Sequence, residues 1–308
     1  MIAIPIQKVR KVQNDFESEI KNQRLNTIKR LNKININSFN SEEKEYLEFV
    51  KDIFEQNEDI LLWDLDVINN KILSNAFKTV PTKKIKDIVI EKLGYKELRK
   101  SFYPNYFNKI GIKACVYCNS QLTIVTEKNQ AKFEVDHYFP KADYPFLSIT
   151  LCNLYPACAS CNGIKGKSKI EFSLYTNDVQ PKEESLYSFE IQPQAKSKYL
   201  TKKNKEVLEI KFNEPIYSSP EIRTFNDTFN IEGIYKTQLD LIEELIIKSQ
   251  IYNDAYLKTL QQSFYKLNLN PELFKRILIG NYTNDKEIHK RPMSKITMDI
   301  AKQLGLIE

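Results

Sequence analysis

Residues 115–118 read CVYC, residues 133–141 read FEVDHYFPK and residues 158–167 read CASCNGIKGK. The first and last stretches each hold two cysteines three positions apart, a spacing that lets one tight turn present two thiolates to a single ion. All five cysteines of the 308-residue chain fall between positions 115 and 161, which cysteines scattered through a core would not do. We therefore predict a closed structural zinc site with four ligands: Cys115, Cys118, Cys158 and Cys161.

Cysteine pairs also occur in disulfide frameworks and in thiol redox proteins. A disulfide framework is disfavoured because the number of cysteines is odd. A thiol redox protein is an alternative, although neither CxxC pair opens a thioredoxin-like β-α-β unit. The fifth cysteine, Cys152, is interpreted as a small buried apolar side chain and not as a ligand.

Four polar side chains lie between and just after the cysteine pairs: Asp136, His137, Asn153 and Asn162. A histidine whose pKa is near 6.5 can accept a proton from water at neutral pH. Asp136 precedes His137 on a predicted strand, so the two side chains should point to opposite faces. Taken singly, Asp-His is an ordinary surface pair and Asn162 a helix cap. Together, framed by both cysteine pairs, they indicate a catalytic centre.

In residue type, order and spacing, residues 115–169 resemble the HNH, or ββα-metal, endonucleases. The resemblance implies that His137 is the general base and that Asp136 and Asn162 bind one divalent cation. It also implies that Asn153 ties the loop together and orients His137. Asn162 departs from the histidine of the founding pattern, and an oxygen-only ligand set favours Mg²⁺ or Mn²⁺ over zinc.

The resemblance implies a nucleic-acid substrate, with DNA as the expected one and RNA left open as the alternative. Lys165 and Lys167 follow the second cysteine pair, where they could hold phosphates, although a solvated surface pair explains them equally well. The net charge of +6 suits a polyanionic partner only mildly, because an AT-rich genome also enriches lysine. Strand preference, sequence specificity and oligomeric state are left open. A homo-oligomer is one of the oligomeric states considered.

The flanking sequence predicts helices on both sides of this centre. Expected helices span about 12–33, 59–75 and 236–267, and Asn40 with Glu43 predicts a capping box. Further helices are expected from Asn40 to Gln56, from Pro81 to Gly94, from Pro271 onward and from Pro292 to Leu304. The aromatic residues of 95–109 are expected to pack in the core, and His289, in a polar stretch, to be exposed.

These elements predict a predominantly helical α+β fold with a central ββα-metal unit. We expect a helical N-terminal region (1–110), the nuclease core with its zinc site (111–170), a segment rich in strands and loops (171–234) and a helical C-terminal region (235–308). No apolar run is long enough to cross a membrane, and no secretory signal is recognisable, which predicts a cytoplasmic protein.

The layout resembles, more loosely, the HNH nuclease subunits of Septu and retron–Septu anti-phage systems. That resemblance implies a partner ATPase that docks on the helical regions. The alternatives are a stand-alone, restriction-type HNH nuclease and a non-catalytic, zinc-dependent module that only binds nucleic acid.

Overall fold

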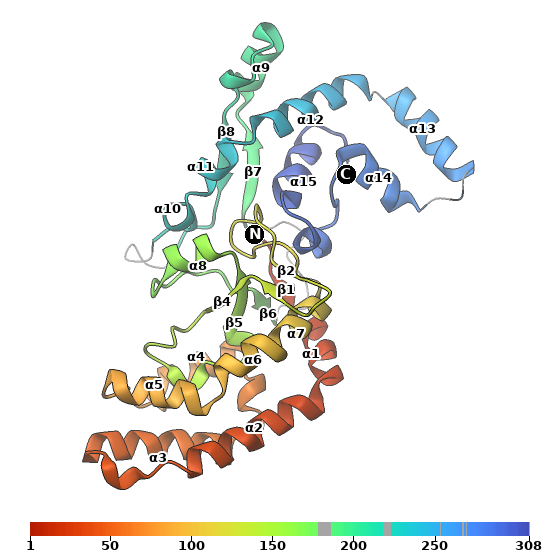
Figure 1. Ribbon diagram of the computed structural model, residues 1–308. Coiled ribbons are helices and arrows are strands. Elements are labelled where there is room, and N and C mark those ends of the chain that lie inside the picture. Colours follow the sequence, from red (N-terminus) through yellow and green to blue (C-terminus); the bar gives the residue numbers. More distant parts are fainter. Residues whose placement is uncertain (178–185, 218–222, 253, 267, 269, 308) are drawn as a thin grey trace.

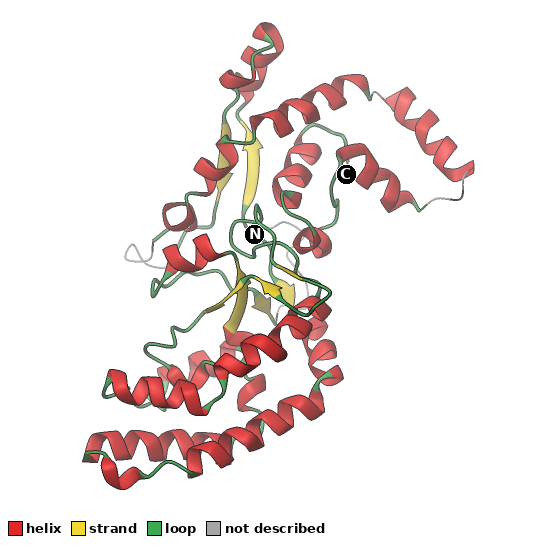
Figure 2. Cartoon of the chain, viewed as in Figure 1, coloured by secondary structure: helices red, strands yellow, loops and turns green. Residues whose placement is uncertain are grey.

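The computed structural model describes residues 1–177, 186–217, 223–252, 254–266, 268 and 270–307. Helices dominate and the strands are short, so the prediction of a predominantly helical α+β fold is confirmed (Figures 1 and 2). The α-helices of the described residues are α1 (Ile6–Asp15), α2 (Glu17–Asn32), α3 (Ser41–Gln56), α4 (Leu65–Leu73), α5 (Lys83–Lys92), α6 (Tyr95–Ser101), α7 (Tyr103–Ile110), α8 (Ala159–Lys165), α9 (Pro193–Lys202), α10 (Phe225–Phe229), α11 (Ile231–Lys236), α12 (Leu239–Ile251), α13 (Asp254–Lys266), α14 (Pro271–Ile279) and α15 (Ser294–Gln303).

The strands of the described residues pair two by two, without forming a larger sheet. One pair is parallel, and it joins the start of the chain to the segment after α8. The other three pairs are antiparallel. The pairs are β1 (Ile4–Pro5) with β6 (Tyr175–Thr176), β2 (Ile124–Val125) with β3 (Ala131–Lys132), β4 (Glu134–His137) with β5 (Leu154–Ala157), and β7 (Ser188–Ile191) with β8 (Ile210–Asn213).

The N-terminal helices follow the predicted order, with two errors of extent. The helix expected over 59–75 begins only at Leu65, because the chain leaves the helical conformation at Trp63 and Asp64 after a short 3₁₀ turn. Asn40 and Glu43 form the predicted capping box, and Gly94 ends the α5 region in the left-handed conformation. The single helix expected over 12–33 is wrong, because the chain breaks at Phe16 between α1 and α2. The Phe16 ring packs edge-on against Phe102 at 5.3 Å between ring centroids, so tertiary packing outweighs local helix propensity there.

The aromatic stretch of residues 95–109 is helical and forms α6 and α7. As expected, its rings pack in the core, where Tyr103, Tyr106 and Phe107 are fully buried. This core supports β4 from one side, because Phe107 also packs against Phe133 at the start of that strand.

Two expectations for the second half of the chain are corrected. The helix expected over 236–267 is two helices, α12 and α13, because the backbone at Tyr252 leaves the helical region (φ −89°, ψ 69°). The segment 171–234 contains the expected short strands, but it also contains α9, α10 and α11. Pro193 occupies the first turn of α9, where its missing N–H costs nothing, and it is a helix start that the strand-like pattern concealed.

The C-terminal region holds the loop that carries the first cysteine pair. The carbonyl of His289 accepts hydrogen bonds from the backbone N–H groups of Lys113 (2.7 Å) and Ala114 (3.0 Å). On the other side of the loop, the Asn119 side chain donates to the Ile288 carbonyl and accepts from the N–H of Lys295, each at 3.0 Å. Residues 288–295 therefore bracket residues 115–118 on both sides.

His289 is buried, which corrects the expectation that it is exposed. Its Nε2 lies 2.8 Å from the Ile2 carbonyl oxygen, and its Nδ1 has no partner among the described residues. The polar residues next to His289 in the sequence do not indicate that it is buried. Its burial comes from packing between residues near the two ends of the described chain. Burial lowers the pKa of His289 to about 4.

We expect His289 to make the protein less stable as the pH falls below about 6.5. The unfolded chain takes up a proton near pH 6.5, whereas the folded chain does so only near pH 4, so acid favours the unfolded state within that window. The free energy of unfolding should lose about 2 kcal/mol from this group between pH 7 and pH 5. Urea titrations at both pH values should show a smaller loss for His289→Gln than for the wild type. Equal losses would contradict this assignment.

Candidate metal and catalytic centre

The centre consists of the antiparallel pair β4–β5 followed directly by α8, and it lies between the N-terminal helices and the C-terminal region (Figure 1). In the register of the two strands Asp136 lies opposite Tyr155 and His137 opposite Leu154. Because successive side chains of a strand point to opposite faces, Asp136 and His137 lie on opposite sides of β4. Helix α8 packs against β4 and against α10.

The four cysteines of the two pairs meet in one buried cluster. The Sγ atoms of Cys115, Cys118, Cys158 and Cys161 all lie within 4.8 Å of one another. Four thiols at such separations, with no disulfide among them, fit the tetrahedral site that a metal ion such as zinc requires. Cys152 is buried outside the cluster, as the sequence predicted.

Backbone and side-chain donors surround the sulfur atoms. The N–H of Cys158 donates to Sγ of Cys115 at 3.3 Å, and the N–H of Cys161 donates to Sγ of Cys158 at 3.4 Å, at the start of α8. The Ser120 hydroxyl donates to Sγ of Cys118 at 3.2 Å. Hydrogen bonds from Cys115 and from the other two thiols lower the pKa of Cys118, so at least one thiolate forms readily.

His137 is buried on the face of β4 that packs against α6. Its Nε2 lies 3.1 Å from the Ser148 carbonyl oxygen, and its ring centroid lies 5.2 Å from that of Tyr95. A carbonyl only accepts, so the bonded Nε2 carries the proton and Nδ1 is the unprotonated nitrogen. Burial, together with the nearby ammonium group of Lys141, lowers the pKa of His137 to about 3. The imidazole is therefore neutral at physiological pH.

Asp136 is buried on the opposite face, toward α8. Its Oδ2 forms an ion pair with Nζ of Lys165 at 3.0 Å and accepts a hydrogen bond from the hydroxyl of Tyr117 at 2.5 Å. The Lys165 side chain is fully buried, and its Nζ also donates to the carbonyl of His137 at 2.9 Å. The carboxylate is thus neutralised by a lysine of α8 and bonded to a residue of the first cysteine pair.

Asn153 links the two ends of the loop between β4 and β5. Its Oδ1 accepts from the N–H of Phe139 at 2.7 Å, and its Nδ2 donates to the carbonyls of Leu147 at 3.0 Å and Phe139 at 3.3 Å. Leu147 precedes Ser148, the residue whose carbonyl holds the His137 ring. These contacts are those that a residue orienting His137 indirectly would make.

The other predicted residues are less closely joined to the centre. Asn162 is half-buried on α8, one residue after Cys161, and its side chain makes no hydrogen bond within the described ranges. Lys167 is exposed. Lys165 lies at the centre, but it bonds to Asp136 and is not open to a substrate phosphate in this arrangement.

Four contacts of the centre were not foreseen from the sequence. Tyr117, Tyr95 and Lys141 were visible as an aromatic residue between two cysteines, an aromatic residue of α6 and a lysine after the Pro140 turn, but nothing in the sequence linked them to Asp136 or His137. The Ser148 contact uses a backbone carbonyl, which any residue type supplies, so no sequence signal could have found it.

Comparison with known proteins gives one partial similarity. The chain is 42% identical over 52 residues to the Septu protein PtuB of Bacillus thuringiensis. The similarity covers 17% of this chain and 19% of that protein, so the chain spans about a fifth of the relative's length. No protein-family model and no solved structure matches the chain. Within the described residues, every helix is too short or too polar to cross a membrane.

Proposed function

We propose that this protein is a metal-dependent endonuclease of the HNH class that hydrolyses phosphodiester bonds in DNA. The observation that carries the proposal is that β4 holds the adjacent, buried His137 and Asp136 and packs against α8, whose start carries two cysteines of the four-thiol cluster. The assigned roles are His137 as base, Asn153 as a positioning residue, and Cys115, Cys118, Cys158 and Cys161 as ligands of a structural Zn²⁺. Lys167, which is exposed, is proposed to contact substrate phosphate.

In the proposed reaction, a water oxygen attacks the phosphorus and its proton passes to Nδ1 of His137, while the bond to the 3′ oxygen breaks. The hydrogen bond from Nε2 to the Ser148 carbonyl fixes the tautomer that leaves Nδ1 free to accept. A pKa of about 3 makes the ring a weak base in the free protein. A bound phosphodiester brings negative charge near the ring and favours its protonated form, which strengthens the base where it is needed.

A divalent cation, Mg²⁺ or Mn²⁺, would be held by Asp136 and Asn162, and it would stabilise negative charge on the phosphate and the leaving oxygen. The donors fit this cation in kind, because both supply oxygen. Lys165 lies 3.0 Å from the carboxylate, so a cation at Asp136 shares it with the ammonium group or displaces that group. Without a bound cation, the ammonium group of Lys165 supplies the positive charge next to Asp136.

The similarity to a Septu protein supports a role in anti-phage defence, and we propose that the chain works there with a partner ATPase. We place the protein in the cytoplasm, with DNA as its substrate. The four proposed regions, 1–110, 111–170, 171–234 and 235–308, give the partner two helical surfaces on which to dock. A stand-alone restriction-type nuclease is the alternative within the same class.

A second class of function is favoured by one observation. The carboxylate of Asp136 is already paired with a fully buried lysine, as it would be in a zinc module that binds nucleic acid without cutting it. Such a module needs neither a divalent cation nor His137 for its activity.

Plasmid cleavage separates the two classes. We expect purified protein to nick or cut plasmid when Mg²⁺ or Mn²⁺ is added, and His137→Gln to cut at least about a hundredfold more slowly, because general base catalysis contributes about 10²- to 10⁴-fold. His289→Gln is the matched control, because it changes the only other histidine, which is also buried. That variant should retain cleavage.

Cleavage that persists in His137→Gln, with the protein folded, would overturn the assignment of the base. A zinc-loaded wild type that binds DNA but cuts nothing with either cation would favour the binding module.

A further inference from the structure

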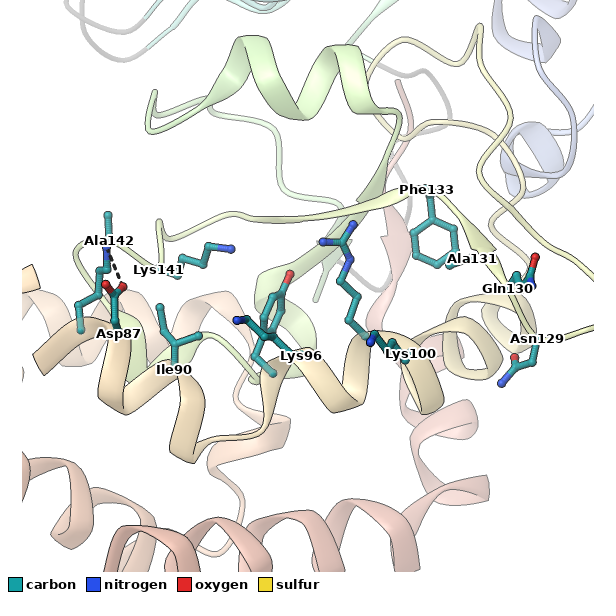
Figure 3. A pocket seen from close by; sticks show the side chains of 13 residues that line it. Asp87, Ile90, Lys96, Lys100, Asn129, Gln130, Ala131, Phe133, Lys141 and Ala142 are labelled. Atoms are coloured by element: carbon teal, nitrogen blue, oxygen red, sulfur yellow. Dashed lines mark ion pairs between the residues drawn. The ribbon is translucent and has the colours of Figure 1, made fainter. Parts of the chain in front are cut away.

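A cavity lined by several cations lies beside the candidate centre. Its volume is about 760 Å³, and it lies between α5 and α6 on one side and the β2–β3 turn with the loop after β4 on the other (Figure 3). Tyr95 lines it, and the same ring contacts His137. The cavity is therefore next to the proposed base.

The side chains that line this cavity carry an excess of positive charge. Five cations and one carboxylate, Asp87, line it, which leaves an excess of four positive charges. The five cations are Lys86, Lys96, Arg99, Lys100 and Lys141. Asp87 pairs with Lys86 at 3.2 Å, and Arg99 pairs with Glu134.

Three of the five cations have no acidic partner among the described residues: Lys96, Lys100 and Lys141. Lys96 and Lys100 are exposed one turn apart on α6 (Figure 3). Lys141 lies over the Tyr95 ring at 4.8 Å. Burial and the neighbouring charge of Arg99 lower the pKa of Lys141, and the carboxylates of Asp136 and Glu134 act in the opposite sense. A surface with these unpaired cations favours the binding of an anion.

We infer that this cavity is the groove that binds the backbone of one strand of duplex DNA and leads it to His137. The inference rests on the proposed function and names the surface that holds its substrate.

The arrangement of the cations favours a polyanion over a small anionic ligand. A small anion needs donors that converge on one point, whereas these cations are spread along a helix and an opposing loop. The aromatic side chains of the groove, Tyr95 and Phe133, are buried, so they do not offer the stacking platform that single strands use. A cube of the cavity's volume has an edge of about 9 Å, less than the ~12 Å width of the DNA major groove alone, so the cavity is too small to enclose a whole duplex.

Anisotropy of a fluorescent 30-base-pair duplex, measured without added divalent cation, tests this inference apart from cleavage. We expect Lys96→Glu/Lys100→Glu to weaken binding at least about tenfold near 0.1 M salt. The slope of log K against log salt should become shallower by about 2, because two phosphate contacts are lost at ~0.9 each.

The matched control is Lys198→Glu/Lys202→Glu on α9. These two lysines are also four residues apart, exposed and without an ion pair among the described residues, and α9 lies at the far end of the molecule (Figure 1). The control changes net charge identically, and its affinity should stay within about twofold of the wild type. Lys96→Gln/Lys100→Gln removes the same two phosphate contacts, so it should show a similar loss of slope with a smaller loss of affinity, and it serves if the double Glu variant misfolds.

Equal weakening by both pairs, wild-type affinity in the α6 variants, tighter binding of single strands, or no duplex binding by the wild type would each overturn the groove. If duplex binding depends on the α6 lysines but the wild type cuts no DNA, the groove is supported and the proposed nuclease activity is contradicted. If the protein cuts DNA equally well with and without the α6 substitutions, the nuclease activity is supported and the groove is contradicted.

Discussion

Cys158→Ser is expected to leave the centre of the protein unfolded and free of zinc. A structural Zn²⁺ contributes an apparent ~10–16 kcal/mol to folding, which is as large as the whole stability of an ordinary domain, roughly 5–15 kcal/mol. Cys158 also accepts a hydrogen bond from the N–H of Cys161 at the start of α8, so its loss affects the helix that carries Lys165. Elemental analysis should find one zinc per wild-type chain, and circular dichroism should show lost helix and a lost thermal transition in the variant.

Cys152→Ser is the control for this experiment, because Cys152 is also buried but lies outside the cluster. Its replacement should cost only the few kcal/mol of a poorly matched buried hydroxyl and leave the zinc content unchanged. If Cys158→Ser melts like the wild type, the cluster is not a metal site on which the fold depends.

Lys165→Met is expected to lower the free energy of unfolding by roughly 3–5 kcal/mol, because it leaves the buried carboxylate of Asp136 without its ion-pair partner. The double variant Asp136→Asn/Lys165→Met should recover part of that loss, since no unpaired charge remains. Urea unfolding of the two single variants and the double variant measures the coupling directly. Additive effects would show that the pair has no energetic link.

The same variants test for a cation without any cleavage assay. If Asp136 binds Mg²⁺ or Mn²⁺, either ion should raise the melting temperature of Lys165→Met by mass action, and it should do so less in the double variant. A cation effect of the same size in both would place the ion elsewhere.

Prediction from sequence succeeds furthest where local chemistry decides the structure. The Asn40–Glu43 capping box and the left-handed Gly94 depend on contacts within one turn, and both are present. The four cysteines were recognisable because their spacing alone specifies two ligand pairs, and they do come together. Asp136 and His137 face opposite sides of β4, as strand alternation requires.

What the sequence did not contain was the environment of each side chain. A lysine is rarely buried, so both interpretations of Lys165, a phosphate contact and a solvated surface residue, placed it at the surface, and only the packing of α8 on β4 reveals its buried position. The burial of His289 and the break at Tyr252 likewise arise from contacts between distant segments. Local propensity cannot anticipate such contacts.

The bracket of residues 288–295 around the loop at 115–118 has a consequence for the timing of synthesis. A ribosome adds about 5–20 residues per second, so roughly 6 to 25 seconds separate the emergence of α8 from that of the bracket. During that interval both thiol pairs and the α8 lysine exist, but the loop that carries Tyr117 lacks the backbone partners that fix it. A nascent chain, or one truncated before residue 288, should therefore hold an incomplete centre. The centre is therefore complete only after residue 295 has been translated and has folded against the loop.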